Sequence, residues 1–80
     1  MNITVKFFAF KQLAGAAERV AALPEGATVA ELAEWLLGQV PQLAPYSAEI
    51  LYLANQQLAQ RDQPLHEGDV VRLLKIVGGG

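Results

Sequence analysis

One amphipathic helix, from Thr28 to Val40, constrains the fold of this chain more than any other segment. Thr28 and Glu31 have the spacing of a capping box, in which each side chain satisfies a free backbone N–H group at the helix start. Gly38 and Pro41 are predicted to end the helix, because proline disfavours the helical conformation in the residue before it. The apolar positions recur at helical spacing and form one stripe: Val29, Leu32, Ala33, Leu36 and Val40. This stripe is expected to pack on a sheet.

Strand-like segments lie on both sides of the helix. Residues 2–10 alternate polar and apolar side chains, and residues 18–23 follow after the turn "KQLAG", so the two are predicted to form a hairpin. "ILYLA" at residues 50–54 and "VVRLLKIV" at residues 70–77 predict two further strands, and "LAQ" at residues 58–60 predicts a short fifth one. Residues 41–49, with two prolines, are predicted to be an irregular crossover. The order predicts an α+β fold, a β-grasp with a mixed four- to five-stranded sheet on one main helix and the first and last strands central.

The bulk properties of the sequence exclude several classes of protein. Eighty residues correspond to one domain, and we assign residues 1–77 to it, with residues 78–80 as a flexible glycine tail. The absence of cysteine excludes disulfides and a thiol nucleophile. A net charge of −2 gives no basic surface for nucleic acid, and no apolar run predicts a membrane span. We therefore expect a cytoplasmic globular domain that binds neither nucleic acid nor membrane.

The ionisable side chains predict no catalytic or metal site. His66 is the single histidine and lies in a polar loop, where an exposed structural role is expected. Asp62, Glu67 and Asp69 lack the spacing of a calcium loop. No helix follows the glycines at residues 78–80, so they form no phosphate-binding loop. The chain is therefore predicted not to be an enzyme and to bind no cofactor.

Alternate residues of the first and last strands face opposite sides of the predicted sheet, and this alternation predicts an apolar surface on the side away from the helix. If Ile3, Val5 and Phe7 face the helix, Phe8 faces the other side. On the last strand, Val71 and Leu73 would face the helix, whereas Val70, Arg72 and Leu74 would share the opposite face. A two-layer fold leaves that face uncovered, and contiguous apolar surface of this kind often marks an interaction site.

Three stretches of the sequence together resemble a known family. They are "FFAFKQLAG" at residues 7–15, "ANQQL" with "PLHEGDVV" at residues 54–71, and the glycines at the end. In order and spacing they resemble the small, sulfur-carrying subunit of molybdopterin synthase over nearly the whole chain. The resemblance implies a ubiquitin-like β-grasp.

The resemblance also implies a function. Gly80, preceded by Gly79 and Gly78, would be adenylated with ATP by a ubiquitin-activating-type adenylyltransferase and converted to a thiocarboxylate with a sulfurtransferase as the sulfur source. The large synthase subunit, in a heterotetramer, would then pass the sulfur to a cyclic pterin precursor of the molybdenum cofactor. Phe8, Leu58 and Leu74 match the hydrophobic positions with which the family docks its partners, and Gly78 belongs to the same contact.

Two alternatives remain open from the sequence. Lys75 and Ile76 stand where the family usually carries two prolines, and "IVGGG" resembles the end of the sulfur carrier of thiamine thiazole synthesis. A carrier for that pathway or for tRNA thiolation, or a protein that tags other proteins, is the first alternative. The second is a non-catalytic β-grasp interaction module with incidental glycines.

Overall fold

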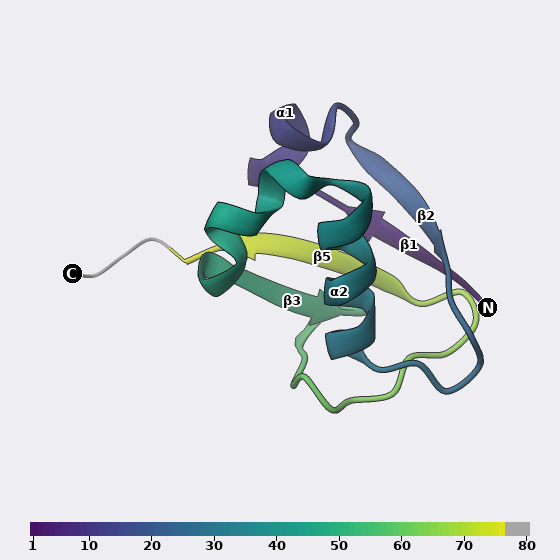
Figure 1. Cartoon of the computed structure of the whole chain (residues 1–80). Helices are drawn as coiled ribbons and strands as arrows, with labels where there is room; N and C mark the ends of the chain where they lie inside the picture. Colours follow the sequence, from purple (N-terminus) through teal and green to yellow (C-terminus); the bar gives the residue numbers. More distant parts are fainter. Residues whose placement is uncertain (77–80) are drawn as a thin grey trace.

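The chain folds into one five-stranded sheet with one main helix packed across one of its faces (Figure 1). The computed structural model describes residues 1–76. The strands are β1 (Asn2–Lys6), β2 (Glu18–Ala22), β3 (Ile50–Ala54), β4 (Gln57–Leu58) and β5 (Val70–Lys75). The helical segments are η1 (Phe8–Phe10), α1 (Lys11–Ala14), α2 (Val29–Gln39) and η2 (Pro41–Glu49). The sheet order is β2-β1-β5-β3-β4.

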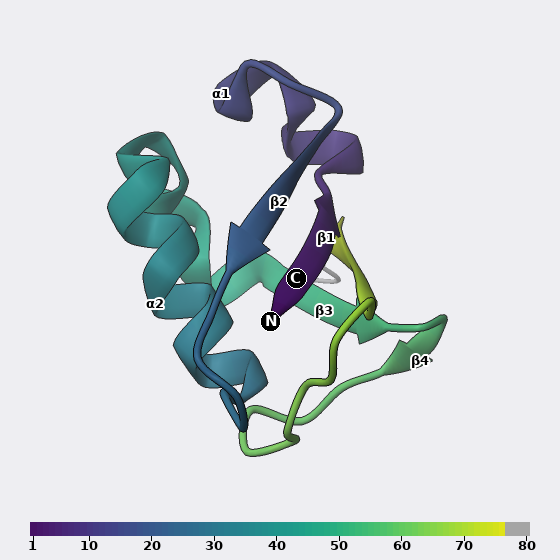
Figure 2. The same cartoon turned by 90° about the vertical axis from the view of Figure 1, so that its right-hand side faces the viewer.

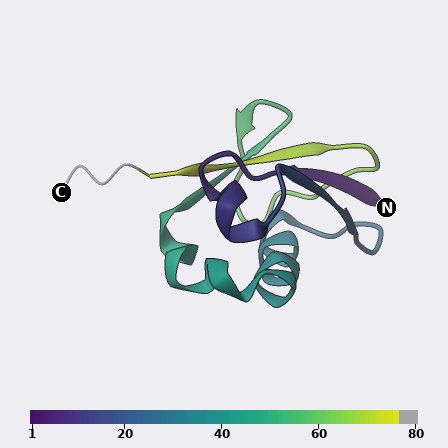
Figure 3. The ribbon, with the colours of Figure 1, turned by 90° about the horizontal axis from the view of Figure 1, so that it is seen from above.

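The first and last strands pair at the centre of the sheet, as predicted. β1 and β5 run parallel, with Val5 opposite Val71 and Lys6 opposite Arg72. The β1–β2, β3–β5 and β3–β4 pairs are antiparallel. Because β1 and β5 run in the same direction, the N-terminus and the end of β5 lie at opposite ends of the molecule (Figure 3).

The capping box of α2 forms as predicted. The Glu31 N–H donates to Thr28 Oγ1 at 3.3 Å, and the Thr28 N–H donates to Glu31 Oε1 at 3.3 Å. The predicted stripe lies against the sheet, and all five of its apolar residues are buried. The prediction that Gly38 ends the helix is wrong, since α2 continues to Gln39 and only Val40, next to Pro41, leaves helical geometry.

The first strand is shorter than predicted. β1 ends at Lys6, where the Phe7 N–H donates to the Ala17 carbonyl at 2.9 Å, and Phe8 begins η1 with a φ of 47°. The expected turn of helix in "KQLAG" is present as α1, closed by Gly15 in the left-handed conformation. Helical spacing brings Phe7 and Phe10 to the same side, and both are buried. A continued strand would have buried only one of these two rings, because alternate residues share a face and Phe7 and Phe10 are an odd number apart.

The crossover after α2 is also more regular than predicted. Residues 41–49 form η2, a 3-10 helix with Pro41 at its start and Pro45 inside it. Proline is tolerated in the first turn of a helix, where its missing N–H group costs no hydrogen bond. Leu43 is fully buried and its N–H donates to the Val40 carbonyl at 3.0 Å. Packing of this leucine therefore orders a segment whose prolines suggested irregular structure.

The buried phenol of Tyr52 predicts an alkaline limit to stability. Burial raises the pKa of Tyr52 above its ordinary value, and the nearby charge of Arg61 offsets part of this increase. Above about pH 10 the unfolded chain loses the phenol proton before the folded chain does, so the free energy of unfolding falls by up to about 1.4 kcal/mol per pH unit. Urea titrations across this range should show a shallower fall for Tyr52→Phe. Equal slopes for the two chains would contradict the prediction.

Candidate functional site

The face of the sheet opposite α2 is the candidate interaction site, and we call it the open face. Figure 2 shows α2 on one side of the sheet, and within residues 1–76 no helix lies across the other side. The buried residues of β1, β3 and β5 point toward α2, so the residues between them face the open side. The open face therefore carries Lys6 of β1, Leu51 and Leu53 of β3, and Arg72 and Leu74 of β5.

Five apolar side chains gather there. Leu51 lies opposite Leu74 in the β3–β5 register, and Leu53 lies opposite Leu58 in the β3–β4 register. Opposite residues on neighbouring strands share a face and contact each other. Phe8 joins them from η1, because the Arg72 guanidinium lies over its ring at 6.0 Å from the ring centroid. We call this set the open-face patch: Phe8, Leu51, Leu53, Leu58 and Leu74.

The three docking residues expected from the sequence all belong to this patch. Phe8 is 48% exposed, Leu58 is 65% exposed and Leu74 is 37% exposed. Burial of such side chains by a partner is favourable at about 25 cal/mol for each Å² of apolar surface. The patch can therefore bind an apolar protein surface.

Two members of the patch, Leu51 and Leu53, were not identified from the sequence. The run "ILYLA" is apolar at every position, which indicates a strand with apolar residues on both faces. Only the register between β3 and β5 shows that Leu51 and Leu53 face the open side.

The end of β5 is held against η2. The Ile76 N–H donates to the Glu49 carbonyl at 2.8 Å, and the Lys75 ammonium lies 5.7 Å from the Tyr46 ring centroid. Tyr46 in turn contacts Phe10, with ring centroids 6.3 Å apart. The chain is thus anchored up to Ile76, whereas the expected reactive residues Gly78, Gly79 and Gly80 lie outside the described residues.

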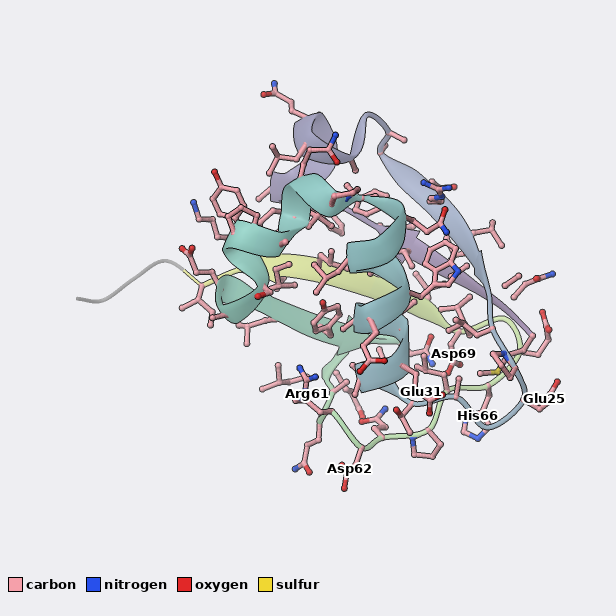
Figure 4. The ribbon with its side chains drawn as sticks, viewed as in Figure 1. Glu25, Glu31, Arg61, Asp62, His66 and Asp69 are labelled. Atoms are coloured by element: carbon pink, nitrogen blue, oxygen red, sulfur yellow. The ribbon has the colours of Figure 1, made fainter. Side chains whose placement is uncertain are left out.

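The ionisable loop residues have structural contacts. The Asp69 carboxylate accepts hydrogen bonds from the His66 N–H at 2.8 Å and from the Asn55 side-chain amide at 2.9 Å. The Glu67 carboxylate accepts from the Asn2 N–H at 3.0 Å. Figure 4 shows Asp62 on the same loop region, apart from His66 and Asp69. The Glu67 and Asp69 carboxylates therefore accept hydrogen bonds from backbone and amide groups close to the starts of β1 and β5.

Three further findings concern the part of the chain that the structure describes. His66 has a side chain that is 79% exposed, and its Nδ1 lies 3.8 Å from Asp69 Oδ2. No group of three or more metal-ligating side chains occurs in residues 1–76. No helix in this range has the length and hydrophobicity needed to span a bilayer.

Comparison with known proteins adds to this geometry. The model of the ThiS family matches residues 5–80. A Pyrococcus furiosus protein described as subunit 1 of the molybdopterin converting factor is 31% identical, over 96% of this chain and 99% of that one, with a TM-score of 0.89. No curated protein matches the sequence significantly.

Two other solved structures are similar over their full length. One is a complex of subunits 1 and 2 of the molybdopterin-converting factor from Helicobacter pylori, with 25% identity over 100% of both chains and a TM-score of 0.73. The other is SAMP1 from Haloferax volcanii, with 25% identity over 100% of both chains and a TM-score of 0.85.

Proposed function

The chain belongs to the ThiS family and has the ubiquitin-like β-grasp fold of a sulfur carrier, and we propose that it carries sulfur as a thiocarboxylate on Gly80 for molybdopterin synthesis. The observation that carries the choice of pathway is the similarity to subunit 1 of the molybdopterin converting factor over nearly the whole of both chains. The family match also extends through Gly80.

The proposed chemistry takes place in three steps. A carboxylate is a poor acyl donor, so the Gly80 carboxylate first attacks the α-phosphorus of ATP and releases pyrophosphate, giving an acyl adenylate. Sulfide supplied by a sulfurtransferase then attacks the acyl carbon, displaces AMP and leaves a thiocarboxylate after loss of its proton. In the final step the large synthase subunit positions this sulfur for attack on a cyclic pterin precursor. In this proposal ATP is bound by the adenylyltransferase and not by this chain, and the steps take place in the cytoplasm.

The glycines suit this chemistry. Gly78 and Gly79 have no side chain, so their backbone can approach the walls of a narrow active site closely. The anchor at Ile76 fixes where the tail leaves the domain. The open-face patch, through Phe8, Leu58 and Leu74, supplies the surface with which the domain docks while the tail enters the partner. We propose a heterotetramer of two carriers and two large subunits, in line with the H. pylori complex of subunits 1 and 2.

Intact mass tests the proposal. The purified chain is incubated with ATP, the adenylyltransferase of the same organism and a sulfide source. We expect its mass to rise by about 16 Da, because one oxygen atom is replaced by sulfur. The control omits ATP and should show no change. Absence of the increase with every adenylyltransferase of the organism would contradict sulfur carriage.

The similarity to SAMP1 favours a second candidate function. In this alternative the activated C-terminus serves another acceptor, either a sulfur acceptor such as a thiazole precursor or a tRNA, or a protein. The two functions are distinguished by mixing the chain that carries the thiocarboxylate with the pterin precursor and the large subunit. Transfer of sulfur to the pterin supports the first function, and a stable thiocarboxylate in that mixture supports the second.

A further inference from the structure

Arg72 lies at the centre of the open face without a hydrogen-bond acceptor for its Nε. It is opposite Lys6 in the β1–β5 register and opposite Leu53 in the β3–β5 register. Its Nε is shielded from water and has no hydrogen-bond partner within residues 1–76. A buried donor on a charged group that lacks an acceptor is costly. An acceptor brought by a partner would remove this cost.

Two cationic side chains, Lys6 and Arg72, lie side by side on the open face. Lys6 and Arg72 are neighbours on adjacent strands, and like charges at such positions destabilise the pair. Within residues 1–76 no lysine or arginine side chain has a carboxylate within 4 Å, so neither Lys6 nor Arg72 forms a salt bridge there. The whole chain nevertheless has a net charge of −2. Lys6 also lies opposite Glu18 in the β1–β2 register, whereas neither strand that pairs with β5 places an acidic residue opposite Arg72. Arg72 is therefore the cation of the open face that lacks a carboxylate on a neighbouring strand.

The surface is hollowed on both sides of Lys6. One hollow of about 230 Å³ is lined by Lys6, Asn55, Gln56, Val70 and Arg72. Its wall is fixed, because the Asn55 side chain bonds the Val70 N–H and the Asp69 carboxylate. A second hollow of about 470 Å³ is lined by Lys6, Phe8, Ala9, Lys11, Ala17 and Glu18. An acidic side chain that enters the first hollow meets both cations.

We propose that Arg72 is the specificity-determining residue of the open-face patch and that, with Lys6, it binds a carboxylate of the large synthase subunit. The inference rests on the proposed function for the identity of that partner. Phe8 lies over the guanidinium and is half exposed. When the Phe8 ring packs into the partner, the guanidinium is uncovered from the same side and donates to the incoming carboxylate.

The leucines around Arg72 favour a protein carboxylate over a phosphate group of a nucleic acid. Interfaces between proteins have an apolar centre in which arginine is enriched, and Leu53, Leu58 and Leu74 provide such a centre here. A carboxylate that pairs with Arg72 within this apolar centre fixes how the two proteins align. A partner without an acidic residue at this point would leave the buried arginine unpaired and would bind more weakly. The apolar residues thus supply affinity, and Arg72 supplies selectivity.

The test is the affinity of the purified chain for the large subunit of the same organism, measured by calorimetry. We expect Arg72→Gln to weaken binding by about 10- to 100-fold, the range for a lost hydrogen-bonded charge pair. Arg72→Lys keeps the charge but not the planar fork, and should restore only part of the affinity. Arg61→Gln is the matched control, because Arg61 lies beside Tyr52 and Glu34 on the helix side of the sheet.

The partner carboxylate is identified with a double-mutant cycle. Acidic residues of the large subunit are replaced one at a time by their amides, and one of them should weaken binding of the unaltered chain but not of Arg72→Gln. Affinity of Arg72→Gln within twofold of the unaltered chain would overturn the inference and leave the proposed function standing. Failure of the unaltered chain to bind the large subunit would overturn both. Thermal unfolding of each variant confirms that a loss of affinity comes from the interface.

Discussion

A chain with one lysine added after Gly80 should take up no sulfur under conditions that charge the unaltered chain completely. The proposed acyl adenylate forms on the carboxylate of a glycine that enters a narrow active site. An added residue moves the reacting carboxylate away from Gly80 and places a side chain in that passage. Intact mass after incubation with ATP, adenylyltransferase and sulfide should therefore show no increase, whereas the melting temperature should stay the same, since residues 1–76 make the described core.

A carboxypeptidase that removes terminal lysine provides the control. Trimming the extended chain should restore charging to the level of the unaltered chain, which excludes damage to the domain as the cause. Deletion of Gly79 and Gly80 should also abolish charging but leave binding to the large subunit through the open-face patch. Normal charging of the extended chain would contradict the assignment of Gly80, and retention of biological function by the deleted chain would support an interaction module instead.

Local sequence signals predicted most of the fold. The Thr28–Glu31 capping box and the apolar stripe behind it predicted α2 to within one residue at its start. The short apolar run at residues 50–54 predicted β3 with its observed bounds, and the segment after the turn predicted β2 to within one residue. The errors came where tertiary packing decided the conformation. Phe7 and Phe10 can both enter the core only if the chain leaves the strand, and nothing local in the sequence shows that the core has room for both rings.

The sequence predicted some of the residues that face the open side, and for Phe8 the predicted position was right but the reason was wrong. Leu74 faces the open side because it alternates with the buried Leu73, as expected. Phe8 was placed there as a strand residue, yet it reaches the open side from η1 with a positive φ. The pairing of Lys6 with Arg72 depends on the register of two strands that are more than sixty residues apart, which no local pattern of the sequence fixes.

The neighbours Phe7 and Phe8 should respond in opposite ways to the same substitution. Phe7 is 0% exposed and Phe8 is 48% exposed. Phe7→Ala should lower the free energy of unfolding by about 3–5 kcal/mol, since it removes buried surface and leaves a cavity. Total stability of small domains is about 5–15 kcal/mol, so this variant would be close to unfolding. Phe8→Ala removes mainly the contact with the Arg72 guanidinium and should cost at most about 1 kcal/mol.

The affinity for the large subunit should show the reverse order, with a larger loss for Phe8→Ala than for Phe7→Ala. Phe8 is the aromatic member of the open-face patch, and truncation of such an anchor typically costs about 2 kcal/mol or more, a loss of about 30-fold in affinity. Alanine is a cleaner replacement than glutamate, because a carboxylate at this position would itself pair with Arg72. Urea unfolding and calorimetry on the two variants separate stability from binding. Since the residues are adjacent in the chain, a loss of stability in Phe8→Ala equal to that in Phe7→Ala would mean that the Phe8 ring belongs to the core and not to the interface.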